Sequence, residues 1–110
     1  MLTCRSVNAA TPNRPEWRDE SVDELVRAFG VLRSDEERVA FLRDLCTLAE
    51  IQAMAHRLAA ARLVDRGVSY AEVAERVGGS TTTVTRVAHW LRHGEGGYRL
   101  VLDRLARKRS

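Results

Sequence analysis

Hydrophobic residues recur every three to four positions along most of the chain beyond residue 20. This spacing is typical of amphipathic helices, and no segment shows the strict alternation of a half-buried strand. The pattern predicts an all-α protein with six helices, at 22–32, 35–46, 48–66, 70–77, 81–93 and 98–107. Residues 1–20 show no such period and contain both prolines, so we expect a flexible N-terminal arm there and one domain over 21–110.

The starts of four predicted helices carry the same signal, a Ser or Thr followed three residues later by Glu. In such a capping box the hydroxyl accepts a hydrogen bond from a free backbone N–H, and the carboxylate accepts one from another. The four pairs are Ser21 and Glu24, Ser34 and Glu37, Thr47 and Glu50, and Ser69 and Glu72. Two glycines, Gly67 and Gly78, are placed to end helices in the left-handed conformation.

The apolar positions also predict which side chains face inward. Residues 48–66 are apolar on several sides, which favours a central helix or the seam of a dimer. The helix at 81–93 carries an apolar stripe of Val84, Val87, Ala88 and Leu91. On the first, second and last helices we expect the inward side chains to be Leu25, Phe29, Leu32, Val39, Leu42, Leu45, Cys46, Leu100, Val101 and Leu105.

Composition narrows the class of protein. The chain has 110 residues, of which 45% are hydrophobic and 30% charged, as in a single globular domain. It contains neither a run of apolar residues long enough to span a bilayer nor a signal peptide, so we expect a cytoplasmic protein. The two cysteines, Cys4 and Cys46, form no CxxC motif, and we expect free thiols, exposed and buried respectively.

Charge is distributed unevenly along the chain. The net charge is +3, and it comes from residues 66–110, because residues 1–65 contain more acidic than basic residues. The basic C-terminal half ends in Arg107, Lys108 and Arg109. A basic half of this kind favours a polyanionic partner, to which the terminal cations would add unspecific attraction.

Residues 69–91 are the most informative segment. Two predicted helices are joined there by a short turn containing Gly78 and Gly79, and Ala74 is small enough for the helices to cross closely. This arrangement is that of a helix-turn-helix. The face of the second helix opposite its apolar stripe carries threonines and cations and no acid, which suits the major groove of DNA.

Threonine is a poor helix former, so four threonines within residues 81–85 favour a use in binding over a merely exposed face. The predicted contacts to DNA bases or phosphates are Ser69, Tyr70, Ser80, Thr81, Thr82, Thr83, Thr85, Arg86, His89 and Arg92.

Residues 25–105 resemble the Trp-repressor-like YerC/YecD family of bacterial DNA-binding proteins. The resemblance is carried by DLCTLAEIQ at 44–52, RL at 57–58, AR at 61–62, YAEVA at 70–74, GGS at 78–80, TVTRV at 83–87 and GY at 97–98. It implies a six-helix fold with a central helix-turn-helix, an intertwined homodimer and a sequence-specific transcriptional repressor. A two-fold dimer would place its recognition helices ~34 Å apart and would bind a near-palindromic operator.

The same resemblance bears on ligand binding. In Trp repressors two arginines hold the co-repressor, and the matching positions here are Arg57 and Arg86. Val87 stands where those repressors have Gly, and Trp90 stands where they have Ser. These four residues therefore suggest a vestigial ligand pocket, with Trp90 in or against the old ligand position. We expect no tryptophan co-repressor and no cofactor.

Two other functions stay open: a helix-turn-helix that assembles with proteins, and a repressor that responds to a small molecule. The spacing of His89 and His93 suits a metal, but no third ligand accompanies them, so we expect no metal site. We expect no enzymatic activity, because the chain has neither a phosphate-binding glycine loop nor a nucleophile motif.

Overall fold

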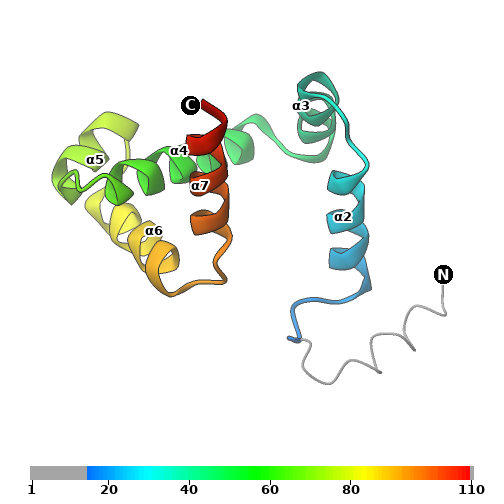
Figure 1. Ribbon diagram of the computed structural model, residues 1–110, viewed down its shortest axis with the longest axis horizontal. Helices are drawn as coiled ribbons and strands as arrows, with labels where there is room; N and C mark the ends of the chain where they lie inside the picture. Colours follow the sequence, from blue (N-terminus) through cyan, green and yellow to red (C-terminus); the bar gives the residue numbers. More distant parts are fainter. Residues whose placement is uncertain (1–14, 110) are drawn as a thin grey trace. The chain divides into compact units, whose positions relative to one another are not determined.

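The computed structural model describes residues 15–109, which form six helices and no strand (Figure 1). The helices are α2 (Glu20–Gly30), α3 (Asp35–Leu45), α4 (Leu48–Asp65), α5 (Tyr70–Val77), α6 (Thr81–His93) and α7 (Gly97–Arg109). The all-α prediction is confirmed, and α5 and α6 have the predicted bounds. Cys4 and most of the expected arm lie outside the described residues, so a flexible arm remains a prediction.

The chain divides into two compact units, Met1–Leu45 and Cys46–Ser110. The first unit contains α2 and α3, whose rings Phe29 and Phe41 pack edge to face with their centroids 5.3 Å apart. Neither of these two helices contains a fully buried residue. The first unit therefore has no closed hydrophobic core of its own within the described residues.

The second unit contains the core, which α4, α5, α6 and α7 share. Its buried side chains are small, mostly alanine and valine, so the helix backbones approach one another closely. They are Ala60, Ala61, Val64, Val73, Ala74, Val84, Val87, Ala88 and Leu102. Val73 and Val84 have no exposed surface at all, which places the centre of the core between α5 and α6.

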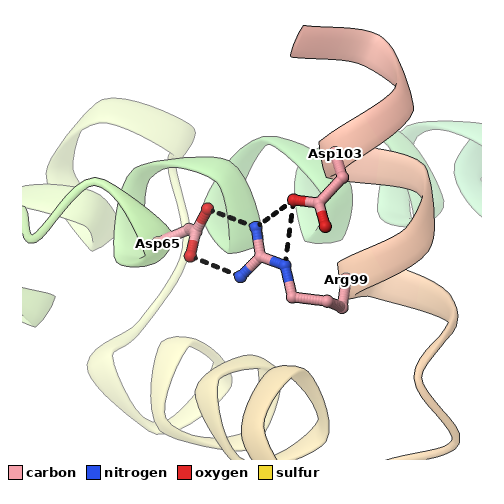
Figure 2. Close-up of polar contacts among 3 residues, drawn as sticks. All are labelled: Asp65, Arg99 and Asp103. Carbon is pink, nitrogen blue, oxygen red and sulfur yellow. Dashed lines mark hydrogen bonds and ion pairs between the residues drawn. The ribbon is translucent and has the colours of Figure 1, made fainter. Parts of the chain in front are cut away.

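One arginine ties α7 to the end of α4 (Figure 2). The guanidinium of Arg99 donates to both carboxylate oxygens of Asp65, at 2.7 and 2.8 Å, and also to Asp103. These hydrogen bonds are the main reason that the pKa of Asp65 lies below its usual value, and the same bonds raise the pKa of Arg99. The clamp fixes the start of α7, which carries Tyr98 and Leu102.

One of the four predicted capping boxes forms completely, and two form in their hydroxyl half only. Thr47 and Glu50 make a complete capping box at the start of α4. The hydroxyls of Ser34 and Ser69 cap α3 and α5, but the partner glutamates bind elsewhere, to the Arg33 amide and the Arg76 guanidinium.

The prediction for Ser21 was wrong. Asp19 caps α2 instead, because its carboxylate accepts from Val22 and thereby starts the helix at Glu20. That hydrogen bond is also the main cause of the lowered pKa of Asp19.

Several inward-facing predictions were also wrong for the single chain. Val39 and Leu45 on α3 are 64% and 49% exposed, and Leu25 and Phe29 on α2 are likewise exposed. On α7, Leu100 and Val101 are exposed and Leu102 is buried, since the inward stripe of that helix runs through Tyr98, Leu102 and Leu105. Cys46 is a free thiol that is half-buried rather than buried.

Candidate nucleic-acid interface

The helix-turn-helix is formed by α5 and α6, which Figure 1 shows in yellow-green and yellow-orange. Ser69 caps α5 and Ser80 caps α6, each through its hydroxyl oxygen and the amide three residues on. Between the helices Gly78 has φ 78°, a left-handed conformation that other residues adopt only with strain. The turn therefore needs this glycine, as the sequence predicted.

The two faces of α6 differ sharply. Val84, Val87 and Ala88 are buried and fix the helix to the core. The other face is exposed and consists of hydroxyl groups and cations, with no acidic residue anywhere on the helix. It carries Thr81, Thr82, Thr83, Thr85, Arg86, His89 and Arg92. The helix thus presents hydrogen-bonding groups and positive charge on a rigid support.

Some of these hydroxyls are already bonded within the helix. Thr85 donates to the Thr81 carbonyl at 2.9 Å, and the Thr83 hydroxyl lies 3.2 Å from that of Ser80. The hydroxyls of Thr83 and Thr85 are therefore held near the backbone, and their predicted contacts to DNA stay predictions. Their methyl groups remain part of an exposed side chain.

Arg86 has no ion pair within residues 15–109, so its charge is available to an outside anion.

Further along α6 the centroids of the His89 and His93 rings lie 5.3 Å apart, and the His89 ring packs edge to face against Trp90. Across residues 15–109 no group of three metal-ligating side chains comes together.

The two predicted contacts at opposite ends of the helix-turn-helix lie side by side. Arg92, near the end of α6, donates to the hydroxyl oxygen of Tyr70, the first residue of α5, at 2.8 Å. The tyrosine ring packs against the core, whereas the arginine is exposed. This contact could not be predicted from the local sequence, because the two residues are 22 positions apart.

The second unit contains a cavity of about 640 Å³ beside the exposed face of α6. It is lined by residues of α4, α6 and α7, by Val77 at the end of α5 and by the turn before α6. All four residues of the predicted vestigial pocket contribute, namely Arg57, Arg86, Val87 and Trp90. Trp90 is 52% exposed and forms part of the wall, so it lies against this space and does not fill it.

Other residues of the cavity were not predicted from the sequence, among them His56 and Tyr98. His56 lies on the stripe of α4 that also carries Ala53 and Ala60, a spacing of three to four residues that could have identified it. Tyr98 could not have been found in this way, since it reaches the cavity only because α7 folds back against α4 and α6. With His56, Arg57 and Arg86 in the wall and no acid, the cavity favours anions.

Comparison with known proteins places this fold and surface in a family. The Trp repressor protein family matches residues 20–106. The YerC protein of Bacillus subtilis (strain 168) is 38% identical over 88 residues, which cover 80% of this chain and 85% of YerC.

Two solved structures are also similar to this chain. A TrpR-like protein from Eubacterium eligens is 32% identical with a TM-score of 0.77, covering 81% of this chain and 92% of its own. A putative Trp repressor from Staphylococcus aureus is 37% identical with a TM-score of 0.78, covering 83% of this chain and 91% of its own.

The chain belongs to the Trp repressor family, whose members are DNA-binding regulators. The resemblance seen in the sequence is thereby confirmed, as is the Trp-repressor-like fold. None of the helices in residues 15–109 is long and apolar enough to cross a membrane.

Proposed function

We propose that this protein is a sequence-specific transcriptional repressor that binds a near-palindromic operator as a homodimer. The observation that carries the proposal is the exposed face of α6, which is free of acids and rich in threonine and arginine. Buried Val84 and Val87 hold that helix rigidly, so its outer face meets DNA without first having to order. Arg86 would bind a guanine edge or clamp a phosphate, and the threonine methyls would meet thymine methyls.

The proposed homodimer is supported by the hydrophobic residues that are exposed in the first unit. Leu25, Phe29, Val39 and Leu45 are exposed on α2 and α3, although such residues normally lie inside. In the second unit, Leu48 and Met54 on α4 are exposed as well. A homodimer that buries these side chains would supply the core that α2 and α3 lack, and intertwined chains are one way to build it.

We propose further that tryptophan is not the co-repressor. Val87 is only 3% exposed and belongs to the core, so its branched side chain stands permanently beside the cavity. Trp90 forms another part of the wall. Adding L-tryptophan should therefore leave DNA affinity unchanged, and isothermal titration should detect no micromolar binding. A clear binding isotherm would contradict this part of the proposal.

A second candidate is a repressor that responds to another small molecule. The cavity volume lies within the range of about 300–1,000 Å³ typical of ligand pockets. Its cationic wall would select an anion with an apolar body. A thermal-shift screen of carboxylates and phosphates tests this candidate, and a compound that raises the Tm should also change DNA affinity.

The salt dependence of DNA affinity distinguishes a DNA-binding protein from the alternative function, a helix-turn-helix that docks on other proteins. Binding to a pool of random-sequence duplexes should weaken steeply as salt rises, by ~0.9 log units per log unit of salt for each phosphate neutralised. The residues that dominate binding in protein-docking surfaces are mostly Trp, Tyr and Arg, and threonine is under-represented among them. Absence of salt-dependent DNA binding would overturn the proposed function.

A further inference from the structure

The hydrogen bond between Tyr70 and Arg92 joins two of the DNA contacts that the sequence predicts. It joins the first residue of α5 to the penultimate residue of α6, whereas the turn at 78–80 joins the other ends of the two helices. The Tyr70 ring packs against the buried core, so its hydroxyl is a fixed point on the surface. Arg92, a long and rotamer-rich side chain, is held at that point.

We propose that Tyr70 and Arg92 form a single pre-assembled clamp for one phosphate of the DNA backbone. The inference rests on the proposed DNA-binding function, and it adds that the two residues act as a unit in which the tyrosine positions the arginine.

The direction of the hydrogen bond supports this arrangement. Arg92 donates and the Tyr70 oxygen accepts, so the hydroxyl proton of Tyr70 is left to donate outward. A hydroxyl that accepts from a cation is polarised and becomes a stronger donor. The guanidinium keeps further N–H donors of its own. The pair therefore offers two adjacent donors and one positive charge, which suit the two non-bridging oxygens of a phosphodiester.

Nearby charges leave Arg92 available for this task. Arg92 shares a small hollow with Asp65 and Arg99. Asp65 is the acid in that hollow, and Arg99 occupies both of its oxygens at 2.7 and 2.8 Å. Arg92 has no ion pair within residues 15–109. Arg99 and not Arg92 thus pairs with the carboxylate in this hollow, which leaves the charge of Arg92 for an outside anion.

The test measures the affinity of the full chain for a pool of random-sequence duplexes over a range of salt concentrations. Four variants are compared with the unaltered protein: Tyr70→Phe, Arg92→Gln, the double variant and Arg92→Lys. Arg104→Gln is the matched control, since it removes an equal charge from an exposed position on α7. Thermal unfolding of each variant establishes that both units remain folded.

Tyr70→Phe and Arg92→Gln should differ in how they change the salt dependence of binding. Tyr70→Phe should weaken binding by about fivefold with an unchanged salt slope, because it loses one hydrogen bond but no charge. Arg92→Gln should weaken binding by about tenfold or more and lower the slope by ~0.9, because one phosphate contact is lost. Arg92→Lys should keep the slope without recovering full affinity, and Arg104→Gln should leave the slope unchanged.

The double variant decides whether the residues act as a unit. It should bind more weakly than Arg92→Gln by clearly less than the fivefold loss of Tyr70→Phe alone, because part of the effect of Tyr70 passes through the arginine that it positions. Three results would each contradict the Tyr70–Arg92 clamp: normal binding by Tyr70→Phe, single losses that multiply in the double variant, or an unchanged salt slope for Arg92→Gln. The two residues would then act independently or only hold the helices together. If the unaltered protein shows no salt-dependent binding at all, the proposed function fails, and the clamp fails with it.

Discussion

The two units of the chain have similar hydrophobic patterns, but among the described residues only the second unit buries hydrophobic side chains fully. In the second unit, α4 to α7 enclose a core in which Val73 and Val84 have no exposed surface. In the first unit, α2 and α3 bury no residue fully, and Phe29 and Val39 are 41% and 64% exposed. Both units show clear helical periodicity, so the periodicity alone does not determine whether a hydrophobic face is covered.

This difference separates the residues that fold the chain from those that assemble it. Helices of 11 residues, the length of both α2 and α3, are marginal in water without tertiary packing. The aromatic contact between Phe29 and Phe41 is little support for two such helices. The second unit has a core within one chain, whereas we propose that the first is covered by a second copy of the chain.

The largest expected effect lies in the second unit. Ala74→Glu should destabilise it by about 3–5 kcal/mol, because the carboxylate would be buried without a partner where α5 crosses the core. Ala71→Glu adds the same charge on an exposed position of α5 and is the matched control. Chemical denaturation followed by circular dichroism measures both. Equal stability of the two variants would contradict the position of the core.

The next effect lies in the first unit and concerns assembly. Val39→Lys should raise the dissociation constant of the dimer by roughly a hundredfold, because an unpaired charge would enter an apolar interface. Ala40→Lys, one residue along α3 and also exposed, should dimerise normally. Analytical ultracentrifugation gives both constants, and circular dichroism should show the helices of the second unit retained. A dimer unaffected by Val39→Lys would remove the proposed role of α3.

Arg86→Ala should affect function without affecting either unit. We expect it to weaken operator binding by about 1–3 kcal/mol while leaving the dimer and the Tm unchanged, because Arg86 is exposed and has no ion pair within residues 15–109. Fluorescence anisotropy with a labelled operator measures the loss. Normal operator affinity would show that the arginine serves only the cavity.

The smallest effect concerns the hydrogen bonds between Arg99 and Asp65 that hold α7 to α4. The folded pKa of Asp65 lies below its usual value, so the hydrogen bonds from Arg99 stabilise the protein above about pH 4 and are lost as the pH falls through the lowered pKa. Both side chains are partly exposed, so Asp65→Asn should lower the Tm at neutral pH by a few degrees at most. This gap between the Tm values should close on acidification, and a gap that is constant with pH would contradict the assignment.

Local signals in the sequence predicted much of the fold. Thr47, Ser69 and Ser80 start helices where expected, and Gly67 and Gly78 have the predicted positive φ. These features depend on a few neighbouring residues, so one sequence contains the information. At α2 two capping residues were available, and Asp19 was chosen over Ser21.

Features that depend on distant packing could not be predicted in this way. On α7 the run of Leu100, Val101 and Leu102 allows more than one inward face, and only its packing beside α4 and α6 makes Leu102 the buried one. The bond between Tyr70 and Arg92 is similar, because it requires two helices to cross at a particular angle. The threonine and arginine face was predicted in full, since it lies on one helix.

Affinity selection from genomic DNA of the host tests the central claim most directly. Purified protein is mixed with sheared DNA at physiological salt, and the retained fragments are sequenced. The account predicts a few sharp peaks that share an inverted repeat with half-sites about one helical turn apart, as two recognition helices of a dimer require. Even coverage of the genome, or no retained DNA, would contradict a sequence-specific dimeric regulator.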